Sequence, residues 1–135
     1  MTKESELDAT GRSLLNLLRA IRSKESCAVT YQGKRRVFSP HMLAKTHPKG
    51  ESTEGRLVVH AYQWGGAGSK GEVTPETGGW RYFYLDEMND SVAFAGDSWY
   101  PVPNEELEKK ERMTPAFIET VIAFVGQTDA KQGNL

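Results

Sequence analysis

The chain has 135 residues, a formal net charge of -1 and a charged fraction of 26%. This length favours one globular domain with its own core. The near-neutral charge argues against strong general attraction to nucleic-acid backbones and leaves room only for a local basic groove. The one cysteine, Cys27, cannot form an internal disulfide and lies in an apolar run, so we expect a buried thiol and a reducing, cytoplasmic location. No apolar run has the length of a signal peptide or a membrane span.

The first predicted element is an amphipathic helix. Its apolar stripe recurs at three- and four-residue spacing, through Leu14, Leu15, Leu18 and Ile21. We expect the helix to end near Ser23 and to cover a core. A strand follows it at once, which argues against a helix-turn-helix that binds DNA.

Five strands are predicted, at residues 26–31, 36–39, 56–64, 79–86 and 91–94. The first two form a hairpin around Gly33, and we expect Pro40 to end the second because proline lacks a backbone N–H. The strand at 79–86 follows two glycines and is aromatic on both faces. Arg81, Phe83 and Leu85 share one of these faces, so we place this strand in the middle of a small sheet or barrel.

Two long connections separate these strands. We expect residues 41–54 to form a polar loop that is either functional or mobile. The glycine-rich segment 65–79 is expected to be a flexible connection between strands. It does not match a phosphate-binding loop, because no Gly-Lys-Ser or Gly-Lys-Thr sequence leads into a helix there.

The C-terminal third is expected to be extended and then helical. Residues 97–103 carry prolines, and Trp99 and Tyr100 are expected to cover one end of the sheet. Residues 104–112 are a charge run typical of a solvated helix. A last helix is predicted from a cap at Thr114 to Gly126, with an apolar stripe formed by Phe117, Ile118, Val121, Ile122 and Val125. This stripe either packs on the barrel or pairs with a second copy of the chain.

The order of these residues resembles the WYL-domain family, a small Sm-like or SH3-like β-barrel of bacteria and their phages. The resemblance covers roughly residues 14–103, and the tripeptide that names the family is absent. It is carried by Tyr31, Gly33, Arg36, Val37 and Pro40, by the strand at 57–63 and the glycine-rich connection, by Gly79-Trp80-Arg81, Phe83 and Leu85-Asp86, and by the strand that contains Phe94. It implies a five-stranded barrel with a leading helix. Together with the C-terminal helix predicted above, the expected fold is mainly β (α+β), a barrel with an N-terminal and a C-terminal helix. The expected division of the chain is a polar segment at 1–12, the barrel domain with its leading helix at 13–103, a helical extension at 104–126 and a flexible tail at 127–135.

The resemblance also implies a function. Domains of this family usually follow a winged helix and act as ligand-sensing regulatory modules, with nucleotides or single-stranded nucleic acid as expected ligands. We expect this chain to be such a sensor or adaptor without a winged helix of its own. The family's basic and aromatic positions fall on Tyr31, Arg36, His41 and Arg81.

The residues themselves support part of this assignment. Arg36 and Arg81 are each followed on the same strand face by a phenylalanine, Phe38 and Phe83 respectively. The planar fork of arginine matches a phosphate, and a base could stack on the ring or on Tyr31. The alternative is that both arginines extend into solvent or pair with Asp86, Glu87 or Asp90.

Nothing in the sequence favours catalysis. The three histidines lack the spacing of a zinc-hydrolase motif, and one cysteine cannot supply a thiolate zinc site. No paired carboxylates or nucleophile elbow are evident. We therefore expect a non-enzymatic protein without metal or cofactor, which binds a ligand through Tyr31, Arg36, His41, Arg81 and Phe83. We expect the ligand-binding form to pass its signal to a protein partner. The alternative is a protein-interaction or dimerisation module without a small ligand, which uses the barrel face or the apolar stripe from Phe117 to Val125.

Overall fold

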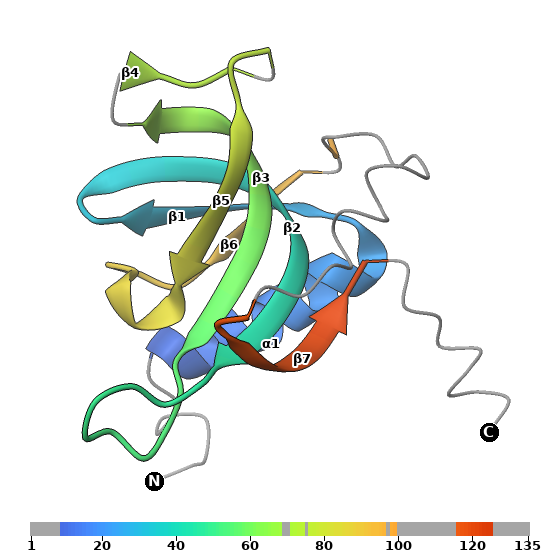
Figure 1. Cartoon of the computed structure of the whole chain (residues 1–135). Coiled ribbons are helices and arrows are strands. Elements are labelled where there is room, and N and C mark those ends of the chain that lie inside the picture. The colour runs from blue at the N-terminus through green and yellow to red at the C-terminus, as the bar shows by residue number, and fades with distance from the viewer. Residues whose placement is uncertain (1–8, 69–70, 75, 97, 100–115, 126–135) are drawn as a thin grey trace, which may run out of the picture.

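The structure is a computed structural model that describes residues 9–68, 71–74, 76–96, 98–99 and 116–125. Within these residues, one α-helix is followed by strands and a short 3-10 helix (Figure 1). The elements are α1 (Ala9–Ser23), β1 (Ser26–Tyr31), β2 (Lys34–Thr46), β3 (Leu57–Gly68), β4 (Gly71–Glu72), β5 (Gly79–Tyr84), η2 (Leu85–Glu87), β6 (Ala93–Gly96) and β7 (Ile118–Phe124).

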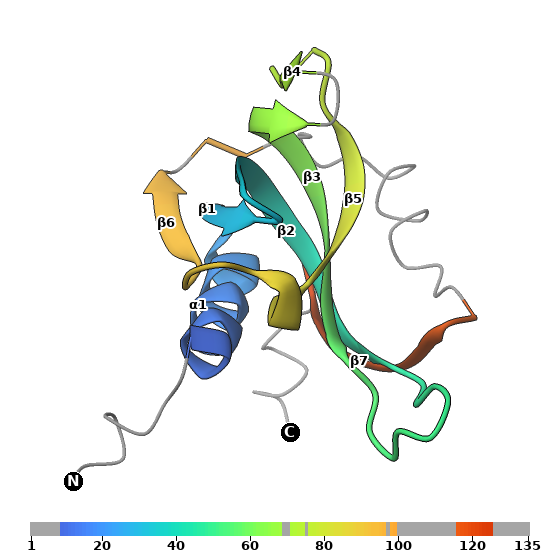
Figure 2. The ribbon, with the colours of Figure 1, turned by 90° about the vertical axis from the view of Figure 1, so that its left-hand side faces the viewer.

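The strands form one antiparallel sheet that curls into a half-barrel. The two longest strands, β2 and β3, pair along most of their length. On its other edge β2 pairs with β1 in its first half and with β7 in its second half. β3 pairs on its other edge with β5 and, near its end, with β4. Helix α1 lies on the inner side of the curl (Figure 2).

The core fills the space between α1 and the inner face of the sheet. Leu17, Ala20 and Ile21 of α1 are buried in the same cluster as Phe38 of β2 and Phe83 of β5. The centres of the two phenylalanine rings are 5.2 Å apart. The apolar spacing of α1 and the alternation of the strands therefore meet in one core, as the two periodicities require. The predictions that the leading helix ends near Ser23 and that a strand occupies residues 26–31 are confirmed.

The prediction that Pro40 ends the second strand is wrong. β2 continues to Thr46, and the expected loop at 41–54 begins only at residue 47. Pro40 is tolerated inside β2 because it lies between the two stretches of β2 that pair with β1 and with β7, where a backbone N–H has no neighbouring strand on that edge. The pairing with β1 ends at Phe38, and the pairing with β7 begins at Met42. The ladder with β3 is also irregular between Pro40 and Met42, and a proline at such a bulge disturbs few hydrogen bonds.

The expected five-stranded barrel is a curled sheet with seven strands among the described residues. Part of the glycine-rich segment is strand, because β3 runs on to Gly68 and β4 returns along it at Gly71. The strand expected at 91–94 lies at Ala93–Gly96. Glycine allows the extension at Gly66, whose φ is +81°, and where a Cβ atom would stand 2.2 Å from the carbonyl oxygen of Arg35.

The prediction of a C-terminal helix is wrong for the described residues of this segment. Residues Ile118–Phe124 form β7 and pair with the second half of β2. Three of the seven are β-branched apolar residues, which pack well on a pleated surface, and the strand fills the edge that β1 leaves open. The predictions for residues 1–8, 100–115 and 126–135, which include the charge run and the tail, lie outside the described residues. In the described part of the chain, no helix has the length and apolar character needed to cross a membrane.

Candidate functional site

Four strands bring five side chains together on the inner face of the sheet, and two of them, Tyr31 and Phe83, belong to the core. Tyr31 comes from β1, Arg36 from β2, Gln63 from β3, and both Arg81 and Phe83 from β5. We call these five residues the arginine site. Side chains two residues apart on a strand, or directly paired across two strands, lie on the same face of the sheet. Arg36 is two residues from the buried Phe38, and Arg81 pairs with the buried Ala61, so both arginines lie on the face that carries the core.

Arg36 is the most unusual member of this site. Its residue is only 9% exposed, and its guanidinium carbon lies 5.6 Å from the ring centre of Tyr31 and 5.9 Å from that of Phe83. Its Nε atom is buried and has no hydrogen-bond partner within the described part of the chain. No carboxylate pairs with it among the residues that the structure describes. Burial, and then the positive charge of Arg81, lower the pKa of Arg36.

Among the described residues, Gln63 supplies the one side-chain hydrogen bond to the Arg36 guanidinium. It is fully buried, and its Nε2 donates hydrogen bonds to the backbone oxygens of Gly65 and Ala67 at 2.9 and 3.0 Å. These two bonds fix the amide so that Oε1 accepts a hydrogen bond from Arg36 Nη1 at 3.5 Å. This contact is long and neutral, and it therefore compensates only part of the buried charge.

Arg81 and the two rings have different roles. Arg81 is exposed, and its Nη1 donates to the backbone oxygen of Trp80 at 3.0 Å. Tyr31 and Phe83 are 5% and 1% exposed, and their rings meet edge to face at 4.9 Å. Both rings contact the Arg36 guanidinium. Because they are buried, they offer little surface on which a base could stack.

His41 does not join the arginine site. It is the extra residue at the bulge of β2, where Pro40 pairs with Ala61 and Met42 pairs with His60. Its ring lies among aromatic rings, 4.8 Å from Trp80 and 4.7 Å from Trp99. Burial lowers the pKa of His41 to about 4, so the ring is neutral at pH 7 and its Nδ1 donates to the backbone oxygen of Ser39 at 2.8 Å.

The acidic residues that were considered as partners of the arginines are engaged elsewhere. Arg56 donates from Nε and Nη2 to Asp86 at 2.9 and 2.6 Å, and from Nη2 to Glu87 at 2.6 Å. These hydrogen bonds lower the pKa of both carboxyl groups. Asp90 accepts hydrogen bonds from the backbone N–H and the hydroxyl group of Thr30.

Sequence reasoning did not single out Gln63 or Arg56. Gln63 stands in a run of strand formers, on the same face as the buried Val59 and Ala61. A polar residue on the buried face of a predicted strand indicates a specific hydrogen-bonded role, because a buried amide needs several hydrogen-bond partners. The position of Arg56 depends on where β2 ends and the loop to β3 begins. The predicted end of this strand, residue 39, was seven residues before the observed end at Thr46.

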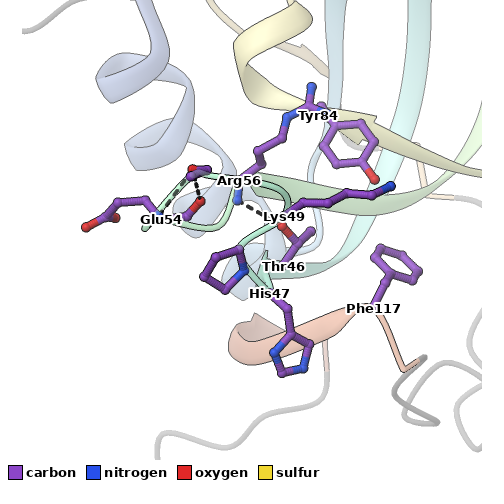
Figure 3. A pocket seen from close by; sticks show the side chains of 9 residues that line it. Thr46, His47, Lys49, Glu54, Arg56, Tyr84 and Phe117 are labelled. Atoms are coloured by element: carbon purple, nitrogen blue, oxygen red, sulfur yellow. Dashed lines mark hydrogen bonds between the residues drawn. The ribbon is translucent and has the colours of Figure 1, made fainter.

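A separate hollow, which we call the hairpin cleft, lies where β2 and β3 meet (Figure 3). It has a volume of about 370 Å³ and is lined by nine residues: Thr46, His47, Pro48, Lys49, Ser52, Glu54, Arg56, Tyr84 and Phe117. Two hydrogen bonds join Thr46 and Arg56 at the base of the loop, each 2.9 Å long. Gly55 permits this close approach, since a Cβ atom there would overlap the carbonyl oxygen of Thr46.

The part of the chain that the structure covers contains no group of three or more His, Cys, Asp or Glu side chains able to hold a metal ion.

No protein-family model matches the sequence. No curated protein matches it at a significant level. Among solved structures, the chain is similar to part of proteasome accessory factor B/C (PafBC) of Arthrobacter aurescens, with 11% sequence identity and a TM-score of 0.49. That alignment covers 80% of this chain and 15% of the PafBC chain.

Proposed function

We propose that this chain is a non-enzymatic regulatory module that binds the phosphate group of a nucleotide or of a short single-stranded nucleic acid at the arginine site. The observation that carries this proposal is the buried guanidinium of Arg36, which has no carboxylate partner among the described residues. Burying an uncompensated charge is unfavourable by several kcal/mol in general, and a bound anion removes much of that penalty. The nearby positive charge of Arg81 adds to the attraction for an anion.

The chemistry favours a phosphate as the recognised group. Arginine presents N–H donors in a flat fork that fits two phosphate oxygens, and Arg36 keeps its Nε without a hydrogen-bond partner in the described chain. Because Tyr31 and Phe83 are buried, recognition of a base is not assigned to them. The proposed site therefore distinguishes ligands by their phosphate and depends little on base identity.

The test is a binding titration of the purified chain with fluorescently labelled short single-stranded DNA and RNA, with nucleoside monophosphates as competitors. We expect saturable binding that weakens with salt. Arg36→Met and Arg81→Met should each weaken it by about tenfold or more, as expected for loss of a charge-assisted hydrogen bond. Arg35→Met is the matched control, because Arg35 is an exposed neighbour on β2 whose side chain lies on the opposite face. Equal affinity of the Arg36→Met and parent proteins would refute the proposal.

A second candidate function is association with another copy through β7. Phe117 and Ile122 are each 38% exposed. Ile122 lies in the strand β7, which replaces the expected helix and its apolar face. Exposed apolar side chains beside an edge strand favour pairing between chains. Light scattering that shows a dimer for the parent chain and a monomer for Ile122→Glu would support this function. A monomeric parent chain would exclude it.

A further inference from the structure

The hairpin cleft is a built hollow, distinct from the arginine site. Its loop is held at the base by Thr46 and Arg56, and an ion pair of 3.0 Å between Lys45 and Glu54 holds the loop to β2. The backbone N–H of His47 donates to the carbonyl oxygen of Phe117 at 3.1 Å, which fixes the segment before β7 against the loop. A hollow of about 370 Å³ lies near the small end of the range typical of small-molecule sites.

Two rings form the apolar part of this cleft. Phe117 is 38% exposed and packs edge to face on Tyr82 at 5.1 Å, so its remaining surface is available. Tyr84 is half-buried, and the guanidinium of Arg56 lies over its ring at 3.9 Å. Arg56 is in turn held by Asp86 and Glu87, which restrains the ring of Tyr84. The cleft therefore presents rigid aromatic surfaces that suit a flat ligand.

The polar groups of the cleft select the charge of that ligand. Figure 3 shows the Lys49 side chain extending toward the hydroxyl end of Tyr84, above Phe117, while the Glu54 side chain points the other way. Within the described residues, neither the Lys49 ammonium nor the Tyr84 hydroxyl group makes a hydrogen bond or an ion pair through its side chain. Glu54 is neutralised by Lys45. A positive charge and a hydroxyl donor thus remain beside an aromatic wall, and their natural partner is a carboxylate.

We infer that the hairpin cleft is a second ligand site, which binds a small aromatic carboxylate with its ring against Phe117 and its carboxylate between Lys49 and Tyr84. No reaction is involved, and the site needs neither a metal nor a second chain. It uses none of the residues of the arginine site.

The experiment is a titration of the full chain with benzoate and, in parallel, with benzamide, which has the same shape and no charge. Amide chemical shifts in two-dimensional NMR spectra report where each ligand binds. For a ligand of this size we expect a Kd for benzoate of about 1 mM, from the usual affinity per atom. Saturable shifts should be confined to the loop at 47–56, Tyr84 and Phe117, and benzamide should bind about tenfold more weakly, as for loss of one charge-assisted hydrogen bond.

Variants separate this proposal from its alternatives. Lys49→Met keeps the aliphatic stem and should reduce benzoate affinity about tenfold while leaving benzamide affinity unchanged. Lys24→Met is the control, because Lys24 is an exposed lysine after α1 that does not line the cleft, and it should leave both affinities unchanged. Arg36→Met should also have no effect, which separates this site from the arginine site.

Three results would overturn the inference. The first is the absence of saturable shifts at about 20 mM benzoate, well above the expected Kd. The second is equal binding of benzoate and benzamide, or benzoate binding that is insensitive to Lys49→Met. The third is loss of benzoate binding in Arg36→Met with no shifts at the loop, since this would place the ligand at the arginine site.

Discussion

The guanidinium carbon of Arg36 lies 5.6 Å from the centre of the Tyr31 ring, and this ring is itself held at its far end. The Tyr31 hydroxyl group accepts a hydrogen bond from the backbone N–H of Tyr84 at 3.1 Å and donates one to Glu87 at 3.4 Å. Glu87 also accepts from Arg56, which borders the hairpin cleft. One side chain thus supports the buried charge and connects it physically to the end of β5.

Removing this hydroxyl group should destabilise the fold. Tyr31→Phe leaves the backbone N–H of Tyr84 without its acceptor, and we expect the free energy of unfolding to fall by about 1 to 2 kcal/mol. Urea denaturation followed by fluorescence measures this change. Tyr84→Phe is the control, since the Tyr84 hydroxyl group makes no hydrogen bond in the described structure, and its effect should stay within about 0.5 kcal/mol. Equal losses in both variants would contradict the role given to Tyr31.

The local periodicities in the sequence were sufficient for the extents of α1 and β1 and for which residues share a face on β2 and β5. The apolar stripe predicted for α1 is confirmed in part, because Leu14, Leu18 and Ile21 pack on the core, whereas Leu15 is 54% exposed and Leu17 is buried instead. Strand parity predicts that Phe83 and Leu85 share a face, and both are buried in the core. The same parity predicts that Arg36 lies beside Phe38 and that Arg81 lies beside Phe83. These inferences succeed because strand and helix geometry relate residues only two to four positions apart.

The errors come from contacts between residues distant in sequence. Pro40 was expected to end a strand, but whether its missing N–H matters depends on where β1 and β7 begin and end. Residues Ile118–Phe124 have an apolar spacing compatible with either a helix or a strand, and the open edge of β2 decides between them. Burial of Arg36 without a carboxylate partner likewise depends on Tyr31 and Gln63, which come from two other strands.

Replacing the buried charge should reveal a conflict between stability and binding. Arg36→Met keeps the volume of the side chain and removes an uncompensated cation, so we expect the free energy of unfolding to stay the same or rise by about 1 kcal/mol. Chemical denaturation with and without ligand tests this expectation. The exposed Arg35→Met should change stability by less than about 0.5 kcal/mol. A loss of several kcal/mol in Arg36→Met would show that the guanidinium is a structural element and not a site held open for an anion.

His41 should make stability depend on pH. The folded protein holds this ring with a pKa of about 4, against an ordinary value of 6.5, chiefly because the ring is buried. Between these two values the unfolded chain binds more protons than the folded one, so stability is complete above pH 6.5 and decreases as pH falls toward 4. The total change is about 3 kcal/mol. Asp86 and Glu87 have lowered pKa values, and their contribution is lost only at more acidic pH.

The measurement for His41 is the thermal midpoint from pH 7.5 to 4.5. His41→Asn should flatten the curve in this window, because an amide does not titrate there. His47→Asn is the matched control, since His47 is exposed in the loop and its replacement should leave the slope unchanged. A parent protein whose midpoint is constant across the window would exclude a buried neutral ring at His41.

Cys27 should be inert until the protein unfolds. The side chain is fully buried in the core, and burial, followed by the negative charge of Glu25, raises the pKa of its thiol to about 12. A shift of this size from 9.0 lowers the thiolate fraction at pH 8 about a thousandfold, and only the thiolate reacts with alkylating agents. Mass spectrometry after treatment with iodoacetamide should therefore show no modification of the native chain and one modification in urea. Because labelling then requires opening of β1 and α1 around the core, its rate in dilute denaturant also reports the stability of the half-barrel. Rapid labelling of the native chain would mean that β1 separates from the core far more often than its burial implies.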